Sequence, residues 1–174
     1  MNNVLYLIRK LRLREHPEGG YFTEIYRSDR VVKSMGQFGP RSLCSSIYYL
    51  LSGLQFSSFH TLKSDEIWHF YLRSSLILHI IEVGGKSKEV ILGASLEKGE
   101  AFQAVVKSNS WFAASVNDCS SFSLVGCTVS PGYDIRDWRL GDRDELTKLY
   151  PQHFLHMTYL SVDGPQVKII FSVL

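Results

Sequence analysis

The sequence predicts an all-β protein, built as an antiparallel sandwich or barrel. Short runs with strand character recur about every ten residues, and glycine, proline or serine turn signals separate about eight such runs. Ten Phe, nine Tyr and three Trp give the chain an aromatic content that is typical of all-β proteins and of ring-lined pockets. No long helical pattern lies between the strands, so a doubly wound α/β fold is not expected.

Two short helices frame the predicted strands. Residues 3–13 repeat apolar side chains with a helical period, and their basic residues lie near the C-terminal end, where the helix dipole favours cations. Residues 142–149 carry early acids and a late lysine, and Pro151 follows the end of this helix. The predicted strands are residues 21–27, 44–51, the region around 58–71, 76–83, 88–92, 101–106, 111–116 and 122–129.

Turns and the chain end complete the pattern. Pro17 stops the first helix, and Gly19 and Gly20 allow backbone angles that other residues avoid. Residues 33–42 contain Gly, Pro and Ser, and this loop is a candidate flap. The tail at residues 156–174 contains two β-like runs, MTYLSV and VKIIFSV, which predict a hairpin whose apolar end needs a partner in the same chain or in another subunit.

Length, charge and cysteine content define the class of protein. A chain of 174 residues fits one domain, and a net charge of +2 without a basic cluster argues against a nucleic-acid partner. No apolar run approaches the ~20 residues of a membrane span, and the N-terminus lacks the cleavage site of a signal peptide. Cys44, Cys119 and Cys127 are odd in number, which favours reduced thiols and a cytoplasmic setting.

The stretch SFHTLKSDEIWHFY (58–71) holds the densest group of candidate functional residues. If Glu66 faces the interior, strand alternation places Trp68 inside as well, whereas His69 faces outward and has a structural role. A carboxylate buried among aromatic rings has a raised pKa, which suits a general acid or base. His60 and Glu66 are therefore the candidate catalytic pair, with a proton shared between them.

A structural role for Glu66 stays open beside the catalytic one. In this alternative the buried carboxylate is neutralised by Arg27, Arg41 or Lys63 and only stabilises the fold. His79, within LILHII, is expected in the core or at an interface.

Aromatic and polar residues elsewhere complete a predicted ligand pocket. Tyr49, Trp68 and Trp111 offer ring faces on which a flat ring or a sugar could pack. Gln103 is a polar residue in an otherwise apolar strand, which indicates a contact with a polar ligand group or with buried water. The predicted ligand-binding residues are thus Tyr49, His60, Glu66, Trp68, Gln103 and Trp111.

Several segments together resemble a group of the cupin superfamily called DUF985 or cupin_5. They are HPEGGYFTEIYRS (16–28), SSIYYLL (45–51), FHTLKSDEIWHFY (59–71), WFAA (111–114) and SLVGCTVSPGYDIRDWRLGDRDEL (123–146). The resemblance extends over residues 5–153, and the tail at 156–174 departs from it. It implies an RmlC-like double-stranded β-helix, a small jelly-roll barrel that is commonly a homodimer, and we expect residues 1–174 to form a single domain of this kind.

The resemblance also bears on metal binding. The usual cupin site takes three histidines and a carboxylate, which suit a divalent transition metal. Only His60 and Glu66 match this pattern: Ser58 stands where a second histidine is usual, and no histidine lies between Gly99 and Trp111. We therefore predict no tightly held metal, and any divalent transition metal would use His60 and Glu66.

Two functions of different class follow from these observations. In the first, the barrel binds a small polar metabolite that contains a ring, similar to a sugar or a nucleotide. In the second, the chain is an enzyme, either a metal-independent epimerase or isomerase or a weak-metal enzyme, that uses His60 and Glu66. The missing metal ligands favour the first, and the retention of both residues keeps the second open.

Overall fold

The computed structural model describes residues 3–33 and 39–161 of the chain. The N-terminal part contains α1 (Val4–Leu11), β1 (Arg14–Glu15), β2 (Tyr21–Arg27), β3 (Val31–Val32), β4 (Arg41–Ser42), β5 (Ser45–Ser52), β6 (Phe56–Leu62) and β7 (Asp65–Arg73). The C-terminal part contains β8 (Leu76–Ile81), β9 (Ser87–Leu92), η1 (Leu96–Lys98), β10 (Gln103–Val106), β11 (Trp111–Val116), β12 (Phe122–Ser130), η2 (Ile135–Asp137), β13 (Trp138–Leu140), α2 (Arg143–Leu149), η3 (Pro151–His153) and α3 (Phe154–Leu160).

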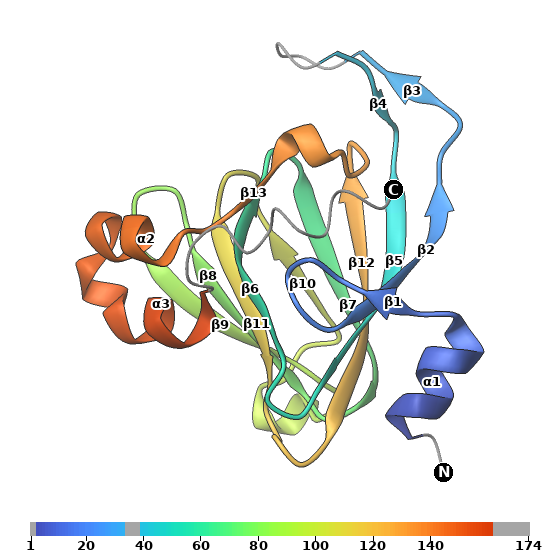
Figure 1. The fold of residues 1–174 in the computed structure, drawn as a ribbon, viewed down its shortest axis with the longest axis horizontal. Coiled ribbons are helices and arrows are strands. Elements are labelled where there is room, and N and C mark those ends of the chain that lie inside the picture. The colour runs from blue at the N-terminus through green and yellow to red at the C-terminus, as the bar shows by residue number, and fades with distance from the viewer. Residues whose placement is uncertain (1–2, 34–38, 162–174) are drawn as a thin grey trace.

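Two antiparallel sheets face each other (Figure 1). One has the strand order β1-β2-β5-β12-β7-β10 and the other the order β13-β6-β11-β8-β9, while β3 and β4 form a separate ribbon. From β5 to β8 and from β10 to β13, each successive strand crosses to the opposite sheet, which is the winding of a jelly roll. The predicted all-β, jelly-roll fold with a short helix near each end is confirmed.

The main core lies between the sheets and follows from strand alternation. On β12, for example, Val125 and Cys127 point inward, and on β11 Phe112 does so. A second core, made by Phe59, Trp111, Leu146 and Met157 with their neighbours, lies between the β6–β11–β8 face and the helices α2 and α3. In Figure 1 these helices cover the outer side of that sheet.

Helix α1 closes the outer face of the other sheet. The Asn3 side chain accepts a hydrogen bond from the backbone N–H of Tyr6 at 2.7 Å and so caps the first turn. Arg12 ends the helix in the left-handed conformation, and Leu7 packs against Leu50. The predicted helix at residues 3–13 is therefore present, shortened to Val4–Leu11.

Two predicted segments differ from the structure. The region around residues 58–71, predicted as one strand, forms two strands, β6 and β7, which lie in opposite sheets. The run MTYLSV was expected to be a strand, but Met157 to Leu160 belong to helix α3, because Met157 and Leu160, three residues apart, both pack into the second core. The run VKIIFSV and residues 34–38 of the candidate flap lie outside the described residues. Within 3–33 and 39–161, every helix is too short or too polar for a bilayer-spanning segment.

Candidate functional site

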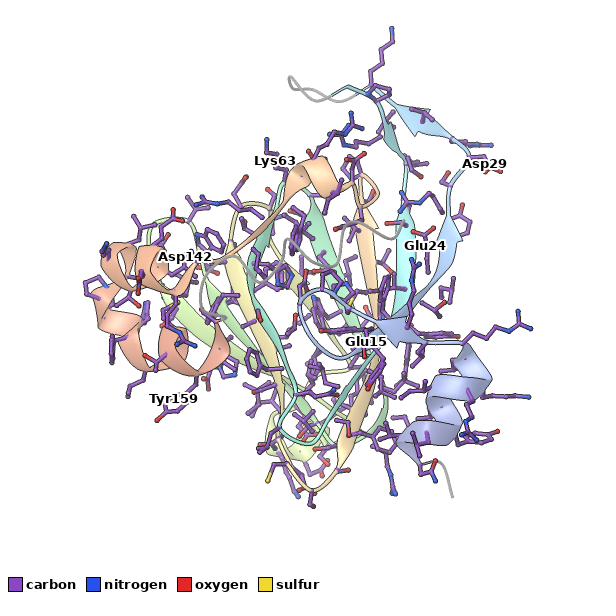
Figure 2. The ribbon with its side chains drawn as sticks, viewed as in Figure 1. Glu15, Glu24, Asp29, Lys63, Asp142 and Tyr159 are labelled. Atoms are coloured by element: carbon purple, nitrogen blue, oxygen red, sulfur yellow. The ribbon has the colours of Figure 1, made fainter. Side chains whose placement is uncertain are left out.

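A cavity of about 630 Å³ lies between the two sheets, and we call it the central cavity. Its volume falls in the range of about 300–1,000 Å³ that ligand sites occupy. The lining residues come from the turn after β1, from β2, β5, β6, β7, β12 and from the segment around β13. Exposed charged residues on β1 and β2 also border the cavity, among them Glu15 and Glu24 (Figure 2), so it is open to solvent on that side.

Glu66 lies on the cavity wall with only 6% of its surface exposed. It lies on an interior strand of its sheet, since β7 pairs with both β10 and β12 at this position. Burial raises the pKa of Glu66 to about 8, with a further contribution from the negative charge of Glu18. The side chain is therefore mostly protonated at neutral pH, and its Oε2 atom has no hydrogen-bond partner among the described residues.

Trp68 and Tyr49 form the aromatic part of the wall beside Glu66. The two rings meet edge to face with centroids 5.9 Å apart. The buried Nε1–H of Trp68 has no acceptor among the described residues, whereas the hydroxyl of Tyr49 donates to the carbonyl oxygen of Gly19 at 2.7 Å. The indole of Trp68 lies close enough to the Glu66 carboxyl group to oppose the rise of its pKa, but neither Nε1 nor Oε2 completes a hydrogen bond among the described residues.

Glu18 is the centre of a buried polar cluster that sequence reasoning did not assign to the site. Its carboxylate accepts hydrogen bonds from Ser57 Oγ at 2.9 Å and from Trp138 Nε1 at 2.5 Å. Oε2 also lies 3.4 Å from Nδ1 of His60 and 3.7 Å from Nδ1 of His16. Burial lowers the pKa of His16, although the Glu18 charge opposes this effect.

The turn that carries Glu18 needs glycine at the next position. Gly19 has a φ of +112°, and a Cβ atom there would lie 2.2 Å from the carbonyl oxygen of Phe56. This close approach lets the backbone N–H of Ser58 reach the carbonyl oxygen of Glu18 at 2.9 Å. The turn is therefore fixed against β6, and Glu18 with it.

His60 has a defined tautomer in its neutral form. Its Nδ1 lies 2.7 Å from the carbonyl oxygen of Ser58, and because a carbonyl oxygen can only accept, Nδ1 carries the proton. Nε2 then holds a lone pair, and no described residue forms a hydrogen bond with it. The ring packs against Phe112 at a centroid distance of 4.0 Å, which holds it in place.

Two predicted ligand-binding residues do not line the central cavity. Trp111 points to the other face of its strand and is buried beneath α2 and α3, while the next residue, Phe112, faces the interior. Gln103 is exposed, and in the register of β7 and β10 it pairs with His69, which also lies off the inner face. The structure thus places Trp111 and Gln103 outside the central cavity, whereas Tyr49, His60, Glu66 and Trp68 line it.

Two of the three predicted partners of Glu66, Arg27 and Arg41, bind elsewhere. Arg27 donates to Glu24, and Arg41 donates to Asp137 at 2.6 Å, so neither cation neutralises Glu66. No ion pair within 4.0 Å joins His60 to Glu66 among the described residues; the carboxylate beside His60 is that of Glu18. The structure therefore does not bring His60 and Glu66 into direct contact, and a proton shared between them would need a bridging group.

His69 lies on the outer face, as strand alternation predicts. Its Nε2 lies 3.1 Å from Oγ1 of Thr128, and its ring is parallel to that of Tyr71. His79 is partly buried on the outer face of the second sheet.

The donor set of the central cavity does not fit the metal site that cupins usually have. Besides His60 and Glu66, such a site needs at least one further ligand atom at short range. In the described part of the chain, no three His, Cys, Asp or Glu ligand atoms of this cavity lie within 4.8 Å of one another. The nearby thiol of Cys127 is buried, which raises its pKa and keeps it protonated.

The residues missed from sequence all come from segments far from β7. Glu18 and His16 stand in the turn HPEGG, and Trp138 follows η2. The proline and two glycines around Glu18 were a signal, since they mark a turn of fixed shape that carries a carboxylate. Arg14 borders the cavity too, with its guanidinium 4.8 Å from the centroid of the Phe22 ring.

Comparison with known proteins gives a consistent set of relatives. The family model described as Cupin superfamily (DUF985) matches residues 5–141. The structure is similar to that of a hypothetical protein from Leishmania major, with a TM-score of 0.88 and 32% identity over 93% of this chain and 100% of that one. It is also similar to protein SO0799 from Shewanella oneidensis, with a TM-score of 0.86 and 36% identity over 94% and 100%.

One curated sequence is similar over most of its length. This is the uncharacterized protein YML079W of Saccharomyces cerevisiae, 27% identical over 92% of this chain and 87% of the yeast protein. The names of these three proteins indicate neither a ligand nor a reaction.

Proposed function

The chain belongs to the cupin superfamily, in the family DUF985, and from this membership we propose that its central cavity binds a small polar metabolite that contains a ring, such as a sugar or a nucleotide. The proposal rests on one observation above all. Two buried polar atoms of the wall, Oε2 of Glu66 and Nε1 of Trp68, have no partner among the described residues.

Such unpaired atoms are costly in a folded protein. A buried donor or acceptor without a partner costs about 1–3 kcal/mol, so most buried polar groups are satisfied. Because both atoms belong to residues that line an open cavity, a ligand that supplies one acceptor and one donor would satisfy them together. The neutral carboxyl group of Glu66 suits this role, since it can donate as well as accept.

The chemical class of the ligand follows from the rest of the wall. The rings of Phe22, Tyr49 and Trp68 offer apolar surface for one face of a sugar or base. At the open side, the exposed Arg14 would bind a phosphate group, and Arg27 would do so in exchange for Glu24, with which it is paired. Glu15 and Glu24 balance the charge of the two arginines, so the attraction would come from guanidinium hydrogen bonds and not from a net positive charge. A phosphorylated or nucleotide-linked sugar therefore fits both ends of the cavity.

A ligand panel tests this proposal. Thermal shift and calorimetric titration are run with free hexoses, hexose phosphates, nucleosides and nucleotide-sugars, on the wild type and on Glu66→Gln and His69→Gln. We expect at least one class to bind the wild type and His69→Gln equally and Glu66→Gln at least tenfold more weakly. Equal binding by all three proteins would contradict a site at Glu66. Native mass spectrometry of the purified chain adds the mass of any co-purified ligand and tests the proposed homodimer.

A second candidate function is proton transfer on a bound sugar. His60 favours this function. Its Nδ1–H donates to the Ser58 carbonyl oxygen and lies near Glu18, so the ring cannot rotate freely and Nε2 is available as a base. Glu66, protonated at neutral pH, is an acid within the same cavity. A base and an acid in one cavity suit an epimerase or isomerase that needs no metal.

Isotope exchange separates this enzyme from a binding protein. A nucleotide-sugar that binds in the panel is incubated with the protein in D₂O, and proton NMR follows exchange of its carbon-bound hydrogens. If the chain is an epimerase, the wild type exchanges one position, and His60→Gln loses the exchange while it still binds. Binding without exchange would leave the binding protein as the function.

A further inference from the structure

We infer that the outer face of the second sheet carries a site for a divalent transition metal ion, best suited to Zn²⁺, built from His79, Glu89 and His156. The three ligand atoms of these residues all lie within 4.8 Å of one another, and among the described residues no other group of this kind occurs. The site lies outside the central cavity, and it is independent of the proposed function.

Three separate elements bring the ligands together. His79 on β8 and Glu89 on β9 are directly opposite each other in the antiparallel register, so their side chains share one face. His156 comes from α3, which packs over that face. These three residues, together with Phe59, Ile81 and Lys88, line a hollow of about 430 Å³ that is open to solvent.

The distances match the geometry that zinc requires. Oε1 of Glu89 lies 2.9 Å from Nδ1 of His79 and 3.4 Å from Nε2 of His156. Ligands at about 2.0–2.1 Å from a tetrahedral zinc ion lie about 3.3 Å from one another. Small rotations of the half-exposed Glu89 and His156 side chains are therefore enough to form the site.

The surroundings of His79 support a role as a ligand. In this structure, Nδ1–H donates to Oε1 of Glu89 at 2.9 Å and Nε2 accepts from the hydroxyl of Ser115 at 3.1 Å. A metal ion would replace the proton on Nδ1, and Nε2–H would then donate to the same Ser115 hydroxyl, which can accept as well as donate. Histidines that bind metals almost always have such a second partner, which fixes the ring and the tautomer.

No cation of the neighbouring strand occupies the place of the metal ion. Lys88, next to Glu89, donates to Glu82 at 2.6 Å. Two histidines and one carboxylate are a ligand set that zinc commonly adopts, with the fourth position open, here toward the hollow. A bound ion would join α3, at 154–160, to the β8–β9 hairpin, and α3 lies beyond residues 5–141 that the family model covers.

The experiment uses the full chain, stripped of metal by a chelator and then titrated with Zn²⁺ in competition with a chromogenic chelator. The wild type is expected to bind one Zn²⁺ per chain. His156→Ala and Glu89→Gln should each weaken this binding at least tenfold; both side chains are about half exposed, so neither change disturbs the core. His153→Ala is the matched control, because this histidine lies on the same segment, contacts the carbonyl oxygen of Gly85 and should leave the affinity unchanged.

A second readout identifies the ligands directly. Co²⁺ in place of Zn²⁺ should give the intense visible absorption of a tetrahedral site in the wild type and in His153→Ala, and lose it in His156→Ala. Unchanged Zn²⁺ affinity in both His156→Ala and Glu89→Gln would overturn the inference. Failure of the wild type to take Zn²⁺ from the competing chelator would also overturn it, as would binding that is lost on substitution of His60 instead.

Discussion

Replacement of Glu66 by glutamine should stabilise the protein, and the gain should grow with pH. The ordinary pKa of a glutamate side chain is 4.5, whereas the folded protein raises that of Glu66 to about 8. Between these two values the unfolded chain releases the proton and the folded chain keeps it, so the folded state loses stability as pH rises. The penalty is nearly absent below pH 4.5 and complete above pH 8.

The size of the effect follows from the two pKa values. Each pKa unit corresponds to about 1.36 kcal/mol, so the penalty is about 1 kcal/mol at pH 5, about 3 kcal/mol at pH 7 and about 5 kcal/mol at pH 9. Glutamine has nearly the same shape but cannot ionise, and it therefore removes this dependence. The difference in the free energy of unfolding between Glu66→Gln and the wild type should increase by about 4 kcal/mol from pH 5 to pH 9.

Urea denaturation of both proteins at pH 5, 7 and 9, without ligand, measures this difference. Glu97→Gln, which removes an exposed carboxylate on η1, is the matched control and should stay within about 0.5 kcal/mol of the wild type. A Glu66→Gln difference that is constant over this pH range would refute the raised pKa. The neutral acid on which the second candidate function depends would then be refuted too.

Three further substitutions test the site and the fold. Trp68→Phe keeps an aromatic ring but removes the unpaired Nε1–H, so it should weaken ligand binding about two- to tenfold, measured by calorimetry with the nucleotide-sugar that binds the wild type. Unchanged affinity would show that Nε1 does not contact the ligand. Trp111→Ala should lower the free energy of unfolding, measured in urea, by about 3–5 kcal/mol, because it leaves a void in the core beneath α2 and α3. The affinity for a ligand in the central cavity should be retained. A stable protein with lost affinity would contradict the placement of Trp111. Gly19→Ala should lower the free energy of unfolding by about 2–5 kcal/mol, because the new Cβ would lie 2.2 Å from the carbonyl oxygen of Phe56. Gly99→Ala is the control: this residue also has a positive φ but no atom within 4 Å of the new Cβ, so the loss should be only about 1–2 kcal/mol. Equal losses of stability in the two variants would mean that the contact with Phe56 is unimportant.

The face of a residue was predictable only where one side of its strand is polar. On β7, Glu66 and Trp68 alternate with Ile67 and His69, and the alternation correctly separated inside from outside. On β11, Trp111 and Phe112 are both aromatic, and both are buried, since α2 and α3 cover the outer face on which Trp111 lies. Alternation still held on that strand, but composition could not say which of the two rings faces the cavity.

The polar cluster around Glu18 was beyond sequence reasoning for a different reason. Its carboxylate bonds to Ser57, 39 positions away in the chain, and to Trp138, 120 positions away. Pairings at such separation depend on how the strands are ordered in the two sheets, which no local pattern specifies. The same holds for His156, which the β-like pattern of its segment placed in a hairpin and the fold places beside His79 and Glu89.

The sequence by itself determined most of the longer strands, the main turns and the family, because periodicity, glycine and proline act locally and a family pattern follows the chain. It also determined that the usual cupin metal ligands are incomplete, since residue identity is enough for that conclusion. Only the tertiary structure decided which carboxylate accompanies His60, that Arg27 and Arg41 pair with carboxylates other than Glu66, and that three elements unite His79, Glu89 and His156. These properties depend on distances between segments and on the exclusion of water, and both arise only when the sheets close on each other.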